Sequence, residues 1–163
     1  MKVGLAPIIG DNSSILILGT LPGDESLRRK EYYGHRRNHF WPIMAEVINR
    51  QLSGEYPQRC AEVLRHSFAI WDVLHAAERS GSLDTAIRNA TANDFEHLFR
   101  SYPKLQIIAF NGKGAHALYH RHVATRADIP HDRLTTITLP STSPAYVVPL
   151  ADKIKAWKIA FER

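Results

Sequence analysis

The stretch ILILGTLPG, residues 15–23, decides the fold that we expect for this chain. Four branched apolar residues lead directly into a turn that contains two glycines and a proline. A short apolar run bounded by turn residues is typical of a buried β-strand. Runs of the same kind follow at residues 68–73, 107–110 and 135–139. We therefore predict four strands, the first of them at residues 15–18.

Helical patterns alternate with these strands. They lie at residues 41–51, 58–66, 92–102, 114–122 and 150–161. Such alternation predicts an α/β fold, a three-layer α/β/α sandwich with a central, mostly parallel four-stranded sheet. The chain has 163 residues, of which 44% are hydrophobic, so it is long enough for one substantial core and short for two. We expect residues 1–163 to form a single domain.

The composition limits the possible partners. The formal charge is +5, with 21 basic and 16 acidic residues. This moderate excess favours a polyanionic partner, although a charge of this size also serves solubility. The single cysteine, Cys60, excludes an internal disulfide and any metal cluster that needs several thiolates. Because no apolar run approaches membrane length and no signal pattern is present, we expect a cytoplasmic monomer without metal, cofactor or membrane contact.

Tight turns follow three of the predicted strands. They are GTLPG at residues 19–23, NGKG at 111–114 and PSTSP at 140–144. In an open parallel sheet, ligands bind beyond the carboxyl ends of the strands. Glycine lets a ligand approach the backbone, and serine hydroxyls suit a phosphate oxygen or a base edge. Each turn alone could be an ordinary connection. Three of them on one edge of the sheet favour a binding site there.

A further segment, YYGHRRNHFWP at residues 32–42, combines aromatic rings, basic groups and one amide just before a predicted helix. Together with GTLPG, FNGKG and LPSTSP, in that order, it resembles the uracil-DNA glycosylase superfamily. The resemblance covers residues 15–146. It is strongest to the hypoxanthine-DNA glycosylase branch, followed by the mismatch-specific uracil or thymine glycosylases.

The resemblance implies a monofunctional DNA glycosylase acting on damaged DNA. Such an enzyme flips out a deaminated base and hydrolyses its N-glycosidic bond in base excision repair. Lyase chemistry is not expected, because it needs a lysine amine poised for Schiff-base formation. The preferred lesion stays open among hypoxanthine, uracil and mismatched thymine.

The resemblance also implies a catalytic residue. Most members of the superfamily carry a polar, water-activating residue inside the first turn, where this chain has Leu21. In the hypoxanthine branch the asparagine of the HxxNxFW segment takes over, which makes Asn38 the predicted catalytic residue. An amide does not accept a proton near neutral pH, so Asn38 would position water against the anomeric carbon. The alternative role of Asn38 is to cap the helix that begins near Phe40.

Three positions are predicted to bind the extruded base. Tyr33 would stack on it, with Tyr32 as the alternative. Asn111 offers a donor and an acceptor to the base edge, or else caps the helix that begins near Gly112. Backbone N–H groups of the Leu21 turn would hydrogen-bond a base carbonyl.

The last motif departs from the family's His-Pro-Ser pattern, because Leu139 and Pro140 precede Ser141. It therefore has no histidine to stabilise a departing base anion. Its two serines would grip backbone phosphates, and Ala145 or Tyr146 would fill the gap in the duplex. The full set of predicted DNA contacts is Gly23, His35, Arg37, Lys113, Ser141, Thr142, Ser143 and Tyr146. Arg37 and Lys113 of this set, and Arg36, are equally compatible with solvated surface charge.

Two other classes of protein remain open. A nucleotide-binding α/β protein would cradle a phosphate at residues 111–114, although the Walker and dinucleotide glycine patterns are both missing. The apolar first turn would also suit a non-catalytic DNA-binding relative of a glycosylase. His116 and His120 lie one helical turn apart, but Ala117 stands where a zinc motif has glutamate, so we expect a solvated face rather than a metal site. Asp72, at the end of the second strand, is a further carboxylate on the same edge.

Overall fold

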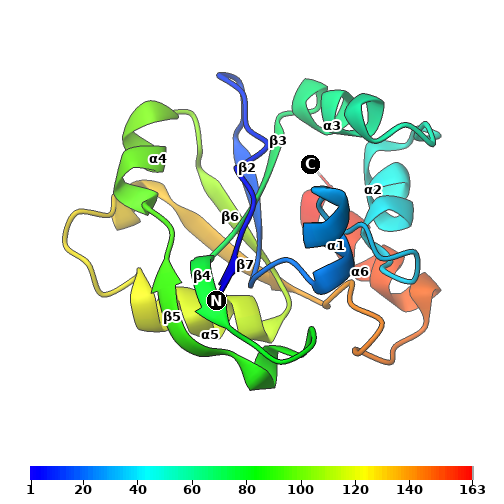
Figure 1. Ribbon diagram of the computed structural model, residues 1–163. Coiled ribbons are helices and arrows are strands. Elements are labelled where there is room, and N and C mark those ends of the chain that lie inside the picture. Colours follow the sequence, from blue (N-terminus) through cyan, green and yellow to red (C-terminus); the bar gives the residue numbers. More distant parts are fainter. Residues whose placement is uncertain (163) are drawn as a thin grey trace.

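A four-stranded parallel sheet forms the centre of the computed structural model, which describes residues 1–162 (Figure 1). Its strand order is β3-β2-β6-β7. The strands are β2 (Ile15–Gly19), β3 (Phe68–Asp72), β6 (Ile107–Asn111) and β7 (Thr135–Leu139). All three pairings are parallel, and Ile17 lies opposite both Ile70 and Ala109. The four predicted strands are thus confirmed, within one residue at their ends.

Helices cover both faces of this sheet (Figure 1). On one face lie α1 (Asp24–Arg29), α2 (Phe40–Ile48), α3 (Tyr56–Arg65) and α6 (Leu150–Phe161). On the other face lie α4 (Phe95–Ser101) and α5 (Lys113–His122). Two short 3-10 turns, η1 (Asp84–Ala86) and η2 (His131–Arg133), complete the helical elements of the described chain. The three-layer α/β/α arrangement is confirmed.

Two predicted helices are shorter than expected, for identifiable reasons. The helix predicted at residues 41–51 ends at Ile48, because Asn49 has left-handed backbone dihedrals (φ 59°) that terminate a helix. The helix predicted at residues 92–102 begins only at Phe95. Its first turn is capped by Asp94, whose side chain accepts a hydrogen bond from His97 N.

A second, antiparallel sheet was not predicted. It has the order β1-β4-β5 and consists of β1 (Lys2–Val3), β4 (Leu74–Glu78) and β5 (Arg88–Ala92). The sequence RNATA of β5 has no alternating apolar pattern, and β1 is only two residues long, so neither gives a strand signal. Because β4 follows β3 almost directly, this sheet carries the loop at residues 79–87 to the carboxyl edge of the main sheet.

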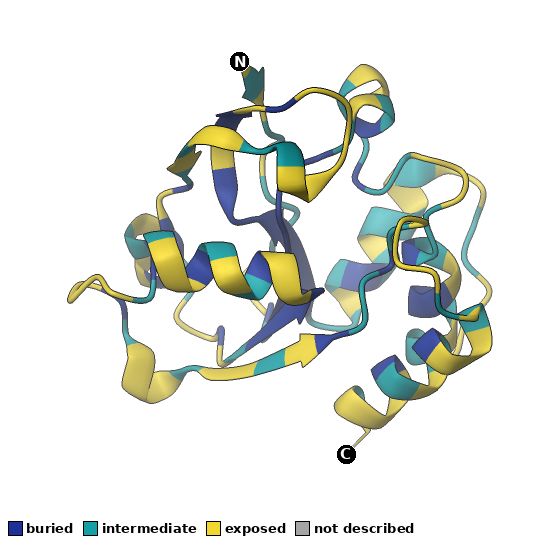
Figure 2. Ribbon diagram, turned by 90° about the horizontal axis from the view of Figure 1, so that it is seen from below, coloured by how far each residue is buried: buried dark blue, intermediate teal, exposed yellow. Residues whose placement is uncertain are grey.

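The core lies on both faces of the main sheet. Every residue of β2, a central strand, and of β3, an edge strand, is buried, as expected for parallel strands covered on both faces. Figure 2 shows the central strands in dark blue, with exposed positions on the outer faces of the helices. Phe40, Phe110 and Trp157 are among the largest buried side chains. This packing holds the strand ends, and the turns that follow them, in fixed positions.

Candidate active site

A cleft of about 560 Å³ opens at the carboxyl edge of the main sheet. It lies between the turn after β2, the segment before α2, the loop at residues 79–87 and the turns after β6 and β7. The predicted site residues that line it are Leu21, Gly23, Tyr33, His35, Asn38, Asn111, Ser141, Thr142, Ser143 and Tyr146. Two predicted DNA contacts, Arg37 and Lys113, are exposed and lie outside this lining. The cleft thus unites segments that are far apart in the sequence.

Tyr33, not Tyr32, borders the cleft. The ring of Tyr33 stacks on the buried ring of Phe40, with 3.9 Å between centroids and 21° between planes. Its backbone is in the left-handed region, with φ 56°. Tyr32 is 3% exposed, and its hydroxyl donates to the carbonyl of Ala6 (2.8 Å). Tyr32 is therefore a core residue, while Tyr33 lies where a ligand can reach its ring.

Asn38 makes the helix-terminal contact that the capping alternative expects. Its Oδ1 accepts a hydrogen bond from Phe40 N, at 2.9 Å, in the first turn of α2. His39 occupies the N-cap position itself. A carbonyl oxygen has two lone pairs, so Oδ1 of Asn38 can accept this bond and one more from a water in the cleft. Capping and water positioning are compatible at this residue.

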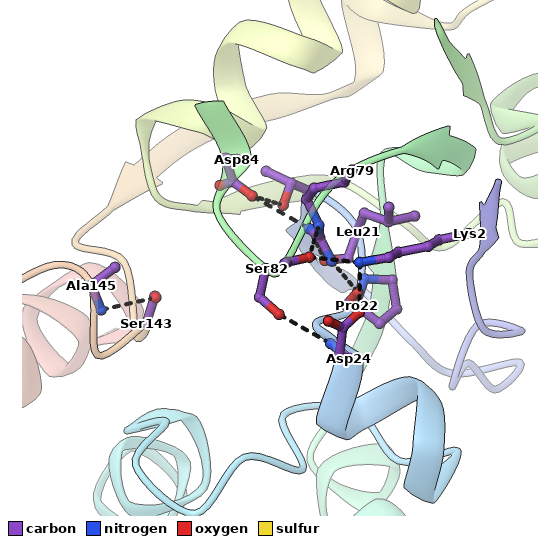
Figure 3. A network of polar contacts seen from close by, with 11 residues as sticks. Lys2, Leu21, Pro22, Asp24, Arg79, Ser82, Asp84, Ser143 and Ala145 are labelled. Atoms are coloured by element: carbon purple, nitrogen blue, oxygen red, sulfur yellow. Dashed lines mark hydrogen bonds and ion pairs between the residues drawn. The ribbon is translucent and has the colours of Figure 1, made fainter. Parts of the chain in front are cut away.

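The turn after β2 is held by a residue that the sequence reasoning missed. The side chain of Arg79 is 1% exposed and donates to the carbonyl oxygens of Leu21 (3.2 Å) and Pro22 (2.5 Å) (Figure 3). Arg79 is also paired with Asp84 at 3.8 Å. Its partners in the turn are 57 and 58 positions away in sequence, so no local pattern indicates the contact.

The loop at residues 79–87 is also tied to the start of α1. Ser82 Oγ accepts from Asp24 N at 3.1 Å. Lys2 Nζ donates to the carbonyl of Gly81 and pairs with Asp24, both at 2.6 Å (Figure 3). The loop at residues 79–87 thus forms one wall of the cleft and holds the turn that contains Leu21.

The opposite wall is the loop at residues 140–146. Ser141 Oγ accepts from Ser143 N, and Ser143 Oγ accepts from Ala145 N, each at 3.1 Å. Each hydroxyl still has its own O–H to donate, which is what a phosphate oxygen requires. Lys153, which is fully buried on α6, donates to the carbonyl of Ser143 at 3.2 Å. The two hydrogen bonds within the loop and the one from Lys153 therefore hold the loop in a defined conformation.

Asn111 uses most of its hydrogen-bonding capacity within the protein. Its Nδ2 donates to Thr142 Oγ1 (3.0 Å) and to the hydroxyl of Tyr33 (3.2 Å). Its Oδ1 accepts from Thr142 N at 2.9 Å. Both amide protons are committed, and one lone pair of Oδ1 remains for a ligand. Asn111 does not cap α5, because Gly112 is the N-cap and no side chain caps that helix.

Asp72 forms part of the cleft floor at the end of β3. The residue is 5% exposed, and its Oδ2 has no hydrogen-bond partner within residues 1–162. Burial raises the pKa of this carboxyl from its ordinary 3.8 to about 7; the nearby Asp84 adds to the rise and Arg79 opposes it. The sequence suggested Asp72 only through its position on the sheet edge.

The other sequence alternatives find less support in the geometry. The N–H of Gly112 donates to the carbonyl of Leu139 at 3.0 Å, so this amide of the 111–114 turn is not free to cradle a phosphate. Within the described residues, no group of three or more His, Cys, Asp or Glu side chains could hold a metal ion. His116 stacks on Phe110, with 5.0 Å between ring centroids. No helix among residues 1–162 is long and apolar enough to span a membrane.

Known proteins match this chain over most of its length. The model of the uracil DNA glycosylase superfamily matches residues 6–161. A hypoxanthine DNA glycosylase of Methanosarcina barkeri is 41% identical over 113 residues, which cover 69% of this chain and 72% of the relative. A hypoxanthine DNA glycosylase of Methanosarcina acetivorans is 39% identical over 116 residues, or 71% and 73% of the two chains.

The fold has a solved counterpart as well. The solution NMR structure of a candidate uracil DNA glycosylase from Methanosarcina acetivorans has a TM-score of 0.81 and 32% identity, and the match covers 98% of this chain and 96% of that one. With this fold and these matches, the cleft defines an enzyme that removes bases from DNA. The chain belongs to the uracil DNA glycosylase superfamily.

Proposed function

We propose that this enzyme excises hypoxanthine from DNA as a monofunctional glycosylase, with uracil as the second substrate to be tested. The observation that carries the proposal is the cleft in which Asn38, Tyr33 and the loop at residues 140–146, the serine loop, converge on the turn after β2. The hypoxanthine assignment is supported by two relatives of that name at 41% and 39% identity.

The chemistry assigned to the cleft needs no covalent nucleophile. A base inside a duplex is out of reach, so the nucleotide turns out of the stack and its base enters the cleft against Tyr33. Cleavage of the N-glycosidic bond puts positive charge on the sugar and negative charge on the base. Asn38 Oδ1 then holds a water against the anomeric carbon, while its hydrogen bond from Phe40 N keeps the amide oriented.

The walls of the cleft supply the DNA contacts. Ser141 and Ser143 donate their hydroxyl protons to phosphates beside the extruded nucleotide, and the exposed Arg37 and Lys113 contact the flanking backbone. Tyr146, which is 46% exposed at the rim, lies against the duplex. The absence of lysine from the described residues that line the cleft supports hydrolysis without a Schiff base.

The test is single-turnover base release from oligonucleotides that carry hypoxanthine, uracil or a mismatched thymine, each single-stranded and paired. We expect release of hypoxanthine by the unmodified protein and a loss of roughly a hundredfold or more in Asn38→Ala, with DNA binding retained. Asn12→Ala, an exposed asparagine far from the cleft lining, is the matched control.

Thermal melting separates catalysis from capping. A lost capping contact costs about 1 kcal/mol of stability and leaves turnover of the folded protein nearly unchanged. Leu21→Asn in the Asn38→Ala background tests whether the first turn can take over water positioning. Base release by Asn38→Ala at the rate of the unmodified protein would exclude a catalytic role for Asn38. If the unmodified protein released none of the three bases, the proposed function would be wrong.

A further inference from the structure

Asp72 occupies a place in the cleft that the roles above leave unexplained. It is the last residue of β3 and stands beside Gly19, the last residue of β2, in the parallel register. A Cβ on Gly19 would lie 2.5 Å from Asp72 Oδ1 and 3.1 Å from the hydroxyl of Tyr33. Glycine at position 19 therefore makes room for a carboxyl and a phenol side by side on the cleft floor.

The carboxyl of Asp72 has no evident structural task. Its Oδ2 is buried and receives no hydrogen bond from the part of the chain that the structure describes. Burying an ionised carboxylate in this state is more costly than burying a neutral carboxyl, which can also donate a hydrogen bond. The pKa of about 7 keeps a large neutral fraction near physiological pH. The charged and titratable groups around it are Arg79, Asp84, Tyr32 and Tyr33, with Asp24, Glu25 and His35 elsewhere in the cleft lining.

The last motif leaves a corresponding gap in the chemistry. Leu139 and Pro140 precede Ser141, so this motif has no histidine to stabilise the negative charge of the departing base. We propose that the neutral carboxyl of Asp72 donates a hydrogen bond to an oxygen or ring nitrogen of the departing base and is a catalytic residue of this enzyme. The inference rests on the proposed function, because it assigns the leaving-group role within that same cleft.

The step balances without an added reagent. The bond between the anomeric carbon and the base nitrogen breaks, and its electron pair goes to the base. The oxygen of the water held by Asn38 forms the new bond to the anomeric carbon. The proton that this water loses ends on the base, while Asp72 keeps its own proton and stabilises the charge by its O–H donor. A neutral donor at this point helps more in the transition state, where negative charge has developed on the base, than in the ground state, where the base is neutral.

This role predicts a specific pH dependence. Excision should be fastest while Asp72 is protonated and should fall about tenfold per pH unit once the pH exceeds its pKa in the DNA complex. An amide is also a donor and does not titrate. Asp72→Asn should therefore keep at least roughly a tenth of the activity and lose the alkaline fall, whereas Asp72→Leu should lose roughly a hundredfold to a thousandfold.

The experiment is single-turnover excision of hypoxanthine from about pH 5.5 to about pH 9 by the unmodified protein, Asp72→Asn and Asp72→Leu. Asp11→Asn, an exposed aspartate far from the cleft lining, is the matched control. Loss of the alkaline fall in Asp72→Asn supports the proposal. It is overturned by an Asp72→Asn profile that still follows that of the unmodified protein, or by an Asp72→Asn loss as deep as that of Asp72→Leu, which would indicate an ionised base instead of a donor.

A binding measurement keeps the inference separate from the proposed function. Each protein is titrated with hypoxanthine-containing DNA and with the matched undamaged duplex. If the unmodified protein released no base, the proposed function would fail, and binding would decide the role of Asp72. If the unmodified protein prefers the lesion and Asp72→Leu does not, the result supports contact between Asp72 and the base. If Asp72→Leu keeps the preference, or the unmodified protein has none, the result excludes this contact.

Discussion

Asn111 and Thr142 exchange two hydrogen bonds: the Thr142 N–H donates to Asn111 Oδ1 at 2.9 Å, and Asn111 Nδ2 donates to Thr142 Oγ1 at 3.0 Å. Asn111 ends β6, and Thr142 lies three residues beyond the end of the neighbouring β7. Both residues are buried. The pair therefore sets the position of the serine loop relative to Tyr33, which also accepts a hydrogen bond from Asn111.

Asn111→Ala should destabilise the fold and impair base selection together. It leaves the Thr142 N–H without its acceptor, and an unsatisfied buried donor costs about 1–3 kcal/mol. Urea unfolding should show this loss, and a double-mutant cycle with Thr142→Val should give a coupling of roughly 0.5–3 kcal/mol. Binding of undamaged DNA should change less, because the exposed phosphate contacts remain. Unchanged stability and unchanged kinetics on every lesion would contradict the pairing described here.

Tyr33→Ala should slow excision of every lesion, because aromatic stacking is worth about 1–3 kcal/mol per base and depends little on base identity. Tyr33→Phe retains the ring on Phe40 and loses only the hydroxyl that accepts from Asn111, so its loss should stay within about tenfold. The comparison is made by single-turnover kinetics on hypoxanthine and uracil substrates. Equal losses in the two variants would mean that the hydroxyl matters and the ring face does not.

Arg79→Met should loosen the turn that carries Leu21. The substitution removes the donors to the carbonyls of Leu21 and Pro22, and hydrogen bonds from a charged group contribute about 1.5–3 kcal/mol each. We expect the free energy of unfolding to fall by at least about 2 kcal/mol and excision to slow as well. Arg50→Met, which changes an exposed arginine just beyond α2 and away from the cleft lining, serves as the control and should fall within about 0.5 kcal/mol of the unmodified protein.

Asp72→Asn should change how stability depends on pH. The pKa of Asp72 is raised in the folded state from 3.8 to about 7, so its contribution to stability is fully present below about pH 4 and is lost as the pH rises through about 7. The asparagine variant lacks this loss. Relative to the unmodified protein, its melting temperature should therefore increase between about pH 5 and about pH 8, by the equivalent of at least about 1 kcal/mol. A constant difference in melting temperature would place the folded-state pKa near its ordinary value.

Excess chelator should leave base release unchanged, because the proposed chemistry uses an amide, a carboxyl and water. The measurement is single-turnover excision before and after dialysis against the chelator, with metal content determined in parallel. Lost activity that zinc or iron restores would require a metal-dependent mechanism.

Much of this protein is determined by local sequence. The apolar runs at residues 15–18, 68–73 and 107–110 become strands of the main sheet because a strand buried on both faces needs continuous apolar residues. Their alternation with helices leaves a parallel sheet as the stable arrangement, and the turns must then meet at its carboxyl edge. These physical rules account for the layers, the strand directions and the place of the cleft.

The remaining features depend on which distant residues pack together. Local pattern does not indicate that Arg79 binds a turn 57 positions away, because its side chain would look the same on a solvated loop. It does not distinguish Tyr33 from Tyr32, since one enters the core and the other the cleft through backbone dihedrals set by the packing. The hydrogen bonds that occupy the amide of Asn111, and the lack of a hydrogen-bond partner for Asp72 Oδ2 among residues 1–162, likewise depend on tertiary packing. Hydrophobic periodicity is a short-range property of the chain, whereas hydrogen-bond partners and the pKa of a buried group are set only when the tertiary structure has excluded water.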